Sequence, residues 1–441
     1  MMKSRRKFWT ILCLAIFVLA IVGAIAWKKW SQRSLPLLPA TVTTAGTSQI
    51  LRGQYYEASI PPSAADSYQS ADFRIWMPQN VPTLRGLIVK QHGCGDDAAA
   101  TGLNHANDLQ WQALAAKHQL GLLSAKFPTG TDPCGDWALI NNGSLTAFFN
   151  ALELLGTQSK HLELNRVPWA LWGHSGGADW IVQIFQQYPD RTIAAIAARG
   201  GAFTLLGTNP TLANTPVLFA LGAKDNIVVK ETRDLPTQAF GRYRKLAAPW
   251  ALAVAANTGH ETGDTRLLAI PYFDALITQR LPLQGNDLRP IDPNLGWLGN
   301  VATKEIAPIA KFTGDPLAAA WLPNEETARK WQQYVTTGKI PPTQKPRAPT
   351  NLQSTRRDSN TVLLTWQYSP DLESGLPAFR IDRNQSAIAT IPKPRHNFGD
   401  APDSPHPVLE FADKNATLNA SYSIVAINQL GESRSESISA R

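Results

Sequence analysis

The residues best suited to chemistry lie at positions 173–177, Gly-His-Ser-Gly-Gly. They fit the pattern Gly-x-Ser-x-Gly, in which a serine stands at the tip of a tight turn between a strand and a helix. Glycine is needed beside the serine because a Cβ atom would clash in so tight a turn. The apolar run 167–172 predicts the strand, and apolar residues at helical spacing over 178–188 predict the helix. This context indicates that Ser175 is a nucleophile.

A serine hydroxyl attacks only when a base takes its proton, so Ser175 requires a histidine oriented by an acid. Asp225 follows one predicted strand, and His260 follows the next. The order serine, acid, histidine predicts His260 as the general base and Asp225 as the carboxylate that accepts its Nδ1 proton. The alternatives for the acid are Asp234 and Asp264.

The negative charge that forms on a carbonyl oxygen during attack requires backbone N–H donors, each worth ~3 kcal/mol in the transition state. Gly176 supplies one donor by its position after the serine. The second is expected from residues 91–95, Gln-His-Gly-Cys-Gly, with Cys94 or Gly93 as the donor. His174, although adjacent to the serine, is expected to be a scaffold residue without a catalytic role.

The elements that must position these residues alternate between short apolar runs and helical patterns over positions 72–271. This alternation predicts an α/β fold with a mainly parallel sheet. The expected strands are 73–77, 86–90, 121–127, 169–172, 193–198, 216–221 and 249–255, and the clearest helices besides 178–188 are 109–118 and 143–155.

The serine motif, the order of Ser175, Asp225 and His260, and the His-Gly start of the 91–95 segment together resemble the α/β-hydrolase superfamily over about residues 70–280. The resemblance implies an α/β-hydrolase domain at 50–282. It also implies hydrolysis of a carboxylic ester through an acyl-enzyme on the serine.

A finer resemblance rests on His92-Gly93-Cys94, on residues 111–115 (Trp-Gln-Ala-Leu-Ala) and on His118. These residues are similar to the polyhydroxybutyrate depolymerase and feruloyl esterase group. The expected partner is therefore a small or polymeric ester substrate. Two other functions share the serine motif, namely a serine peptidase of the prolyl-oligopeptidase type and an inactive hydrolase scaffold used for binding or adhesion. The complete serine, acid and histidine set argues against the inactive scaffold.

Three tryptophans lie in or near the predicted loops, and their large rings are candidates for a pocket that holds an aromatic acyl group or a polymer. They are Trp137, Trp172 and Trp180. Packing in the core is the alternative for each. The sequence shows no metal-ligand spacing, phosphate loop or dinucleotide motif, so no metal and no cofactor are expected.

The region from about residue 348 to 441 changes to alternating strands separated by Asn, Ser, Gly and Pro turns, which predicts an all-β sandwich. Leu-Thr-Trp at 364–366, Phe-Arg-Ile at 379–381, and the run 422–428 with Gly431 resemble a fibronectin type III domain. This domain is expected at 350–441 and is a candidate for contact with a cell surface or polysaccharide.

Two segments connect the predicted domains. Residues 338–349 are rich in Pro, with Lys and Thr among them, and predict an extended linker. Residues 283–337, with a helical pattern at 325–335, are expected to pack against the hydrolase domain.

Residues 1–35 contain an uncharged run at 8–27 between two basic clusters. The basic residues are Lys3, Arg5, Arg6, Lys7, Lys28, Lys29 and Arg33. Twenty uncharged residues are enough to span a bilayer of ~30 Å, so this segment predicts a transmembrane anchor, with the remaining chain exported to the periplasmic or extracellular face. A signal peptide cleaved near Ala24-Ile25-Ala26 is the alternative.

The same segment explains the basic composition of the chain. The formal net charge is +8, but removing the seven basic residues of this segment leaves about +1 for the rest. The globular part is therefore nearly neutral, and nothing in its charge favours a nucleic-acid partner.

The three cysteines also divide between the N-terminal segment and the rest of the chain. Cys13 lies in the apolar segment, which leaves Cys94 and Cys134 in the exported part. Each follows a predicted strand, so a disulfide between neighbouring loops is expected in an oxidising compartment. Two independent buried thiols are the alternative.

Overall fold

The computed structural model of the chain describes residues 41–48, 51–66, 68–128, 134, 136–227, 230–285, 287–403 and 409–440. The predicted membrane segment at 1–35 lies outside these residues. In the part described, no helix is both long and apolar enough to cross a membrane. Residues 40–441 form one compact unit.

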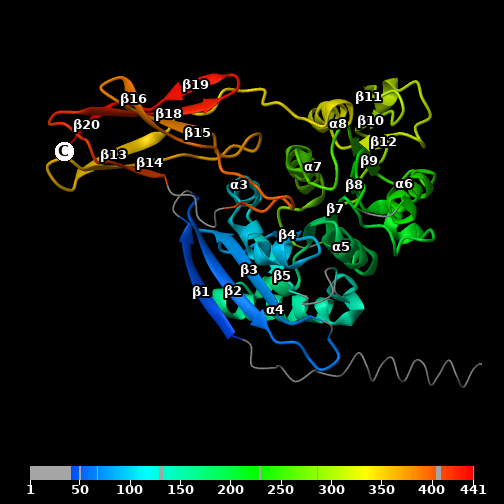
Figure 1. Cartoon of the computed structure of the whole chain (residues 1–441). Coiled ribbons are helices and arrows are strands. Elements are labelled where there is room, and N and C mark those ends of the chain that lie inside the picture. The colour runs from blue at the N-terminus through cyan, green and yellow to red at the C-terminus, as the bar shows by residue number, and fades with distance from the viewer. Residues whose placement is uncertain are drawn as a thin grey trace, which may run out of the picture. The chain divides into compact units, whose positions relative to one another are not determined.

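A nine-stranded sheet organises the first half of this unit, in the order β1-β2-β3-β5-β4-β6-β7-β8-β9 (Figure 1). Its strands are β1 (Thr41–Ser48), β2 (Gly53–Ile60), β3 (Ala71–Pro78), β4 (Gly86–Gln91), β5 (Leu120–Lys126), β6 (Trp169–His174), β7 (Thr192–Ala198), β8 (Val217–Gly222) and β9 (Trp250–Ala255). From β5 across to β9 all neighbours are parallel, whereas β1, β2 and β3 form an antiparallel edge. The predicted α/β fold with a mainly parallel sheet is confirmed.

Helices cover both faces of this sheet (Figure 1). On one face α3 (Leu109–His118) meets α7 (Thr265–Arg280), with the rings of Trp111 and Phe273 6.0 Å apart. On the other, α4 (Ser144–Ser159) meets α5 (Gly176–Gln187), with the rings of Phe148 and Trp180 5.6 Å apart. The sheet is therefore buried on both sides, which accounts for its continuously apolar parallel strands.

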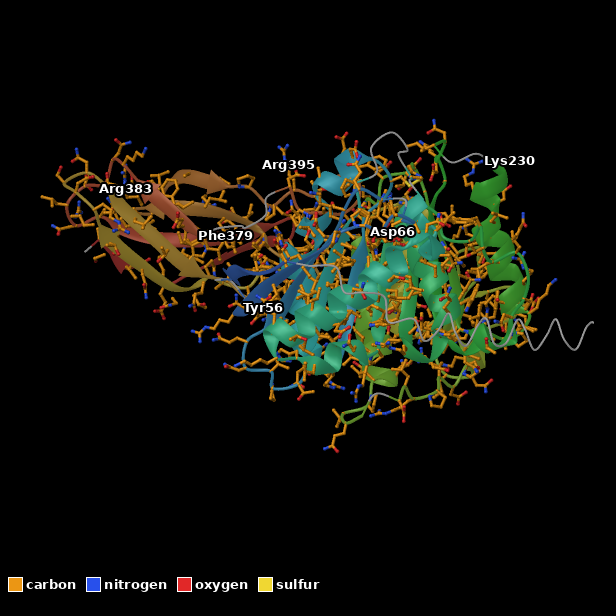
Figure 2. All side chains as sticks on the ribbon, turned by 90° about the horizontal axis from the view of Figure 1, so that it is seen from below. Tyr56, Asp66, Lys230, Phe379, Arg383 and Arg395 are labelled. Atoms are coloured by element: carbon orange, nitrogen blue, oxygen red, sulfur yellow. A yellow bond between two sulfur atoms is a disulfide. The ribbon has the colours of Figure 1, made fainter. Side chains whose placement is uncertain are left out.

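The remaining helices of this half are α2 (Asp96–Ala100) and α6 (Lys230–Arg244), the second beginning at the lysine labelled in Figure 2. Short 3-10 helices connect several elements, at Gly102–Asn107, Asp136–Ala138, Ile140–Asn142, Leu162–Asn165, Pro189–Arg191, Pro210–Asn214 and Ile309–Lys311.

The segment after α7 extends the core of the nine-stranded sheet. It contains a small sheet of β10 (Trp297–Gly299), β11 (Ile306–Pro308) and β12 (Ala320–Leu322), followed by α8 (Glu325–Thr337). The indole Nε1 of Trp331 on α8 donates to the carbonyl oxygen of Leu252 on β9 at 2.9 Å, and its ring is fully buried. Residues from this segment share one hydrophobic core with the large sheet.

The C-terminal region is built from antiparallel strands in two sheets. One contains β13 (Thr350–Arg356), β14 (Val362–Gln367) and β17 (Glu410–Asp413), and the other β15 (Ala378–Arg383), β16 (Ser386–Ile391), β18 (Ser421–Asn428), β19 (Gly431–Arg434) and β20 (Ile438–Ser439). Alternate residues of both sheets form a second core that includes Trp366, Phe379 and Tyr422. Phe379 is labelled in Figure 2. The predicted all-β character of this region is confirmed.

Candidate active site

Ser175 occupies the turn between β6 and α5 in a backbone conformation that favours glycine. Its φ is 54° and its ψ is −123°, and its N–H donates to the carbonyl oxygen of Ala198 at 2.8 Å. A Cβ on Gly173 would overlap the Gly177 carbonyl, and one on Gly177 would overlap the His92 carbonyl. The two glycines are thus required by the tightness of a turn that leaves the serine partly exposed.

The loops after β8 and β9 bring Asp225 and His260 to this serine. His260 Nε2 lies 2.9 Å from Ser175 Oγ, and His260 Nδ1 lies 2.7 Å from Asp225 Oδ2. The other carboxylate oxygen accepts the N–H of Ile227 at 3.1 Å, and both the acid and the histidine are buried. Because a carboxylate only accepts hydrogen bonds, Nδ1 carries the proton, and the lone pair of Nε2 faces the serine hydroxyl.

The two alternative acids lie elsewhere. Asp264 precedes α7, where its Oδ2 accepts the N–H of Ile340 at 2.8 Å and its Oδ1 lies 3.6 Å from Lys339 Nζ. Asp234 lies on α6. Of the three aspartates, Asp225 is the one with a hydrogen bond to His260.

The residues expected to stabilise an oxyanion surround the serine. Gly176 begins α5, so its N–H belongs to the first turn, where helical N–H groups have no partner within the helix. A Cβ on this glycine would overlap Cys94 Sγ, and one on Gly93 would lie 3.2 Å from Ser175 Cβ. The chain segments at 93–94 and 175–176 are therefore in contact.

Cys94 and Cys134, 40 residues apart in sequence, form a disulfide in the structure. The bridge lies against the start of α5, since a Cβ on Gly176 would be 3.8 Å from Cys134 Sγ. It ties the loop after β5 to the loop after β4, directly beside the serine turn.

The expectation that three tryptophans line a substrate pocket is wrong, because Trp137, Trp172 and Trp180 are all fully buried. Trp137 stacks on Phe127 with ring centroids 5.4 Å apart, and Trp180 Nε1 donates to Ser144 Oγ at 2.9 Å. Burial in the core removes large apolar surfaces from water and accounts for all three.

His174, expected from the sequence to be a scaffold residue, has a specific positioning role. Its Nε2 lies 2.8 Å from the carbonyl oxygen of His260, to which it donates a hydrogen bond. Burial lowers the pKa of His174 to about 3, so its imidazole is neutral near neutral pH. The side chain next to the nucleophile therefore holds the backbone of the histidine loop.

Arg199, which the sequence did not indicate, holds the same loop by hydrogen bonds. This buried arginine donates from Nε to the carbonyl oxygen of Glu261 at 3.0 Å and from Nη1 to Tyr334 Oη at 3.2 Å. The Oη of Tyr334, on α8, is in turn 2.7 Å from Thr265 Oγ1. The segment containing α8 thus contributes to the position of His260.

Replacing His174 with glutamine is expected to make stability less sensitive to acid. In the unfolded chain the imidazole binds a proton below about pH 6.5, but in the folded protein only near pH 3. The contribution of the neutral imidazole to the free energy of unfolding is therefore complete above pH 6.5. It is lost as the pH falls toward 3, at up to ~1.4 kcal/mol per pH unit. Glutamine keeps a donor near the position of Nε2 without titrating.

Thermal unfolding measured from pH 7 to pH 4 checks this expectation. The Tm of the wild type should fall more steeply than that of His174→Gln over this interval. Parallel curves for the two proteins would contradict the assigned role of the buried imidazole.

No protein-family model and no curated protein matches the chain. Solved structures do match it. An S-formylglutathione hydrolase from Agrobacterium tumefaciens is 14% identical, with coverage of 54% of this chain and 97% of the hydrolase and a TM-score of 0.38. A cold-adapted esterase from an Arctic intertidal metagenomic library is 15% identical, covering 55% and 100% of the two chains, with a TM-score of 0.37.

A feruloyl esterase module from Clostridium thermocellum is 10% identical, with coverage of 50% of this chain and 90% of the module and a TM-score of 0.32. These likenesses concern the fold. The strands of the chain itself establish its architecture, a mainly parallel α/β sheet followed by antiparallel β sheets.

Proposed function

We propose that the protein is a serine hydrolase that cleaves carboxylic esters through an acyl-enzyme on Ser175. The observation that carries this proposal is the continuous hydrogen-bonded chain from Asp225 through His260 to the serine hydroxyl. A buried carboxylate, an imidazole with its lone pair toward the serine, and a serine in a strained turn are the parts that nucleophilic acyl transfer requires.

In the proposed reaction, Ser175 Oγ attacks the ester carbonyl carbon while His260 Nε2 takes the hydroxyl proton. The carbonyl oxygen becomes an oxyanion stabilised by the N–H of Gly176 and a second N–H from Cys94 or Gly93. The imidazolium, stabilised by the Asp225 carboxylate, then protonates the leaving alcohol oxygen, and the carbon–oxygen bond to the alcohol breaks.

Deacylation repeats these steps with water. His260 takes a proton from water as the water oxygen attacks the acyl carbon. The same proton passes to Ser175 Oγ as the acyl–oxygen bond breaks and the carboxylic acid leaves. Both halves of the reaction therefore depend on one imidazole.

The test combines labelling and turnover. The purified full chain is treated with a fluorophosphonate, the adduct is mapped by peptide mass, and hydrolysis of p-nitrophenyl acetate is followed in parallel. We expect one adduct, on Ser175, together with ester turnover that the label abolishes. The absence of both, or peptidase activity without esterase activity, would overturn the proposal.

We also propose that the protein is exported, with the apolar segment at 8–27 as its anchor. The disulfide between Cys94 and Cys134 supports this, because structural disulfides persist in oxidising compartments. Thiol titration of the denatured chain from an exporting host should find one reactive thiol, that of Cys13. Three thiols would contradict export.

The C-terminal sheets at 350–441 are proposed to be a fibronectin type III-like sandwich. Support comes from their antiparallel strands and from a shared core in which the ring centroids of Trp366 and Phe379 lie 5.6 Å apart. Removal of a ring from this core should cost about 3–5 kcal/mol of the free energy of unfolding. A Trp366→Ala variant with unchanged thermal stability would contradict a packed sandwich.

A further inference from the structure

A loop of the C-terminal region, residues 396–402 between β16 and β17, lies against the candidate active site. The carbonyl oxygen of Phe398 accepts the N–H of Thr262, two residues after the candidate base, at 3.0 Å. The ring centroid of Phe398 lies 6.0 Å from that of His260 and 5.7 Å from that of His174. An aromatic side chain more than a hundred residues beyond the hydrolase strands therefore borders the imidazole.

The 396–402 loop is closed by its own hydrogen bonds. The N–H of Asn397 donates to the carbonyl oxygen of Ala401 at 2.8 Å, and its side-chain Oδ1 accepts the N–H of Gly399 at 3.0 Å and that of Ala401 at 2.9 Å. Its side-chain amide donates to Thr101 Oγ1 at 2.7 Å. The turn that presents Phe398 is thus internally braced and attached to the hydrolase surface.

A buried group of charged side chains also holds the 396–402 loop in place. Asp400 accepts Lys90 Nζ at 2.8 Å, Arg266 Nε at 2.7 Å and the indole Nε1 of Trp111 at 3.3 Å. Burial acts to raise the pKa of Asp400, but Arg266 and Lys90 outweigh it and hold the pKa of this carboxyl well below its usual range. The carboxylate is therefore ionised, and its hydrogen bonds are charge-assisted.

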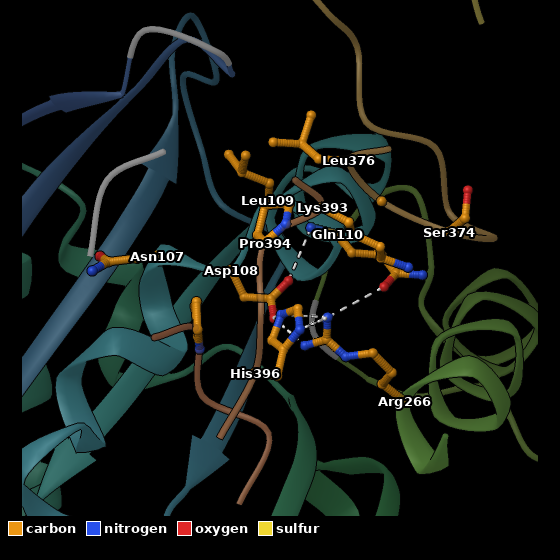
Figure 3. A pocket seen from close by; sticks show the side chains of 12 residues that line it. Asn107, Asp108, Leu109, Gln110, Arg266, Ser374, Leu376, Lys393, Pro394 and His396 are labelled. Carbon is orange, nitrogen blue, oxygen red and sulfur yellow. Dashed lines mark hydrogen bonds and ion pairs between the residues drawn. The ribbon is translucent and has the colours of Figure 1, made fainter. Parts of the chain in front are cut away.

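Arg266 extends this group to the start of α3. Figure 3 shows its guanidinium directed toward Asp108 and His396. Its Nη1 lies 2.6 Å from His396 Nε2, its Nη2 pairs with Asp108 Oδ2, and His396 Nε2 is 3.0 Å from the same carboxylate oxygen. Both ends of the loop are therefore anchored to the hydrolase domain.

Despite these anchors, the Phe398 side chain is 51% exposed. Its backbone is fixed, its ring borders His260, and much of its apolar surface remains open to water. Apolar surface gains free energy when a ligand covers it, by about 25 cal/mol per Å². A rigid loop that holds such a ring beside a candidate base has the properties of a binding surface.

The chemistry decides which part of an ester would contact this ring. The imidazolium must reach the leaving oxygen to protonate it, so the alcohol portion lies on the His260 side of the carbonyl carbon. Building on the function proposed above, we propose that Phe398 binds the alcohol portion of the substrate and selects esters of apolar, above all aromatic, alcohols.

The test uses two esters of the same acid, 1-naphthyl acetate and ethyl acetate, with the full chain and its Phe398→Ala variant. For 1-naphthyl acetate we expect kcat/KM to fall about tenfold, consistent with the loss of one aromatic contact. For ethyl acetate it should change less than about twofold, because a two-carbon alcohol covers little of the ring.

The rate of deacylation distinguishes binding of the alcohol by Phe398 from positioning of His260. Both esters give the same acetyl-enzyme, from which the alcohol has already left, so its hydrolysis rate should be unchanged in Phe398→Ala. A slower deacylation, or equal losses for both esters, would show that Phe398 only positions His260 and would overturn the proposal. Unchanged kinetics for both esters would overturn it too.

Two variants serve as controls. Phe398→Trp keeps an aromatic face and should retain most of the activity toward 1-naphthyl acetate. Leu418→Ala removes another exposed apolar side chain of the C-terminal region and should change neither rate. If the proposed function itself fails, the wild type will hydrolyse neither ester, an outcome distinct from every result above.

Discussion

Ser175→Ala is expected to abolish ester turnover and leave the fold intact. The variant lacks the oxygen that forms the acyl bond, and loss of such a nucleophile lowers kcat by a factor on the order of 10⁶. Alanine keeps the Cβ, so the strained turn at φ 54° remains the same. Steady-state hydrolysis of p-nitrophenyl acetate measures the loss.

Thermal unfolding shows whether the fold is retained, and the Tm of Ser175→Ala should lie within about 2 °C of the wild type. Ser437→Ala, which changes an exposed serine of the C-terminal region, is the matched control and should keep full activity. Turnover near the wild-type rate in a well-folded Ser175→Ala protein would reject the serine as the nucleophile.

The second large effect is expected for Asp225→Asn, with kcat lowered about 10⁴-fold. An asparagine that donates from its amide to Nδ1 favours the tautomer with the hydrogen on Nε2. That nitrogen lies 2.9 Å from Ser175 Oγ and then cannot take its proton. The fold and KM should change little, since the side chain keeps its size.

The two other aspartates provide matched comparisons for this variant. Asp234→Asn should keep nearly full kcat. Asp264→Asn should lower the Tm and leave kcat nearly unchanged. This carboxylate accepts the N–H of Ile340 and not a proton of the imidazole. Full activity in Asp225→Asn with a loss in either of the others would show that the acid is misassigned.

Much of the fold follows from local patterns in the sequence. The buried parallel strands carry continuous apolar runs, and the serine turn carries its glycines, so each is recognisable within a few residues. The antiparallel strands β1 and β2 were missed because polar residues alternate through them without an apolar run. Helices α6 and α7 each contain a proline, at 236 and 271, which obscured their helical pattern.

The order of residues along the chain was enough to predict which side chains the structure brings to Ser175, because loops after neighbouring parallel strands meet at one edge of a sheet. The order of residues does not indicate which side chains are buried, so the expectation that tryptophans near loops line a pocket was wrong. It also gave no sign of Phe398, since the contact between the 396–402 loop and His260 depends on tertiary packing alone.

The pairing of Lys90 with Asp400 joins residues 310 positions apart. Lys90 has no exposed side-chain surface, and its ammonium also lies 4.5 Å from the ring centroid of Trp111. Loss of either partner would leave the other charge buried and unpaired, at a cost of about 3–5 kcal/mol, a large share of the 5–15 kcal/mol that stabilises a typical domain. The central sheet and the C-terminal strands are therefore coupled in unfolding, and a newly made chain completes the surroundings of its serine only after residue 400 has been synthesised and folded back.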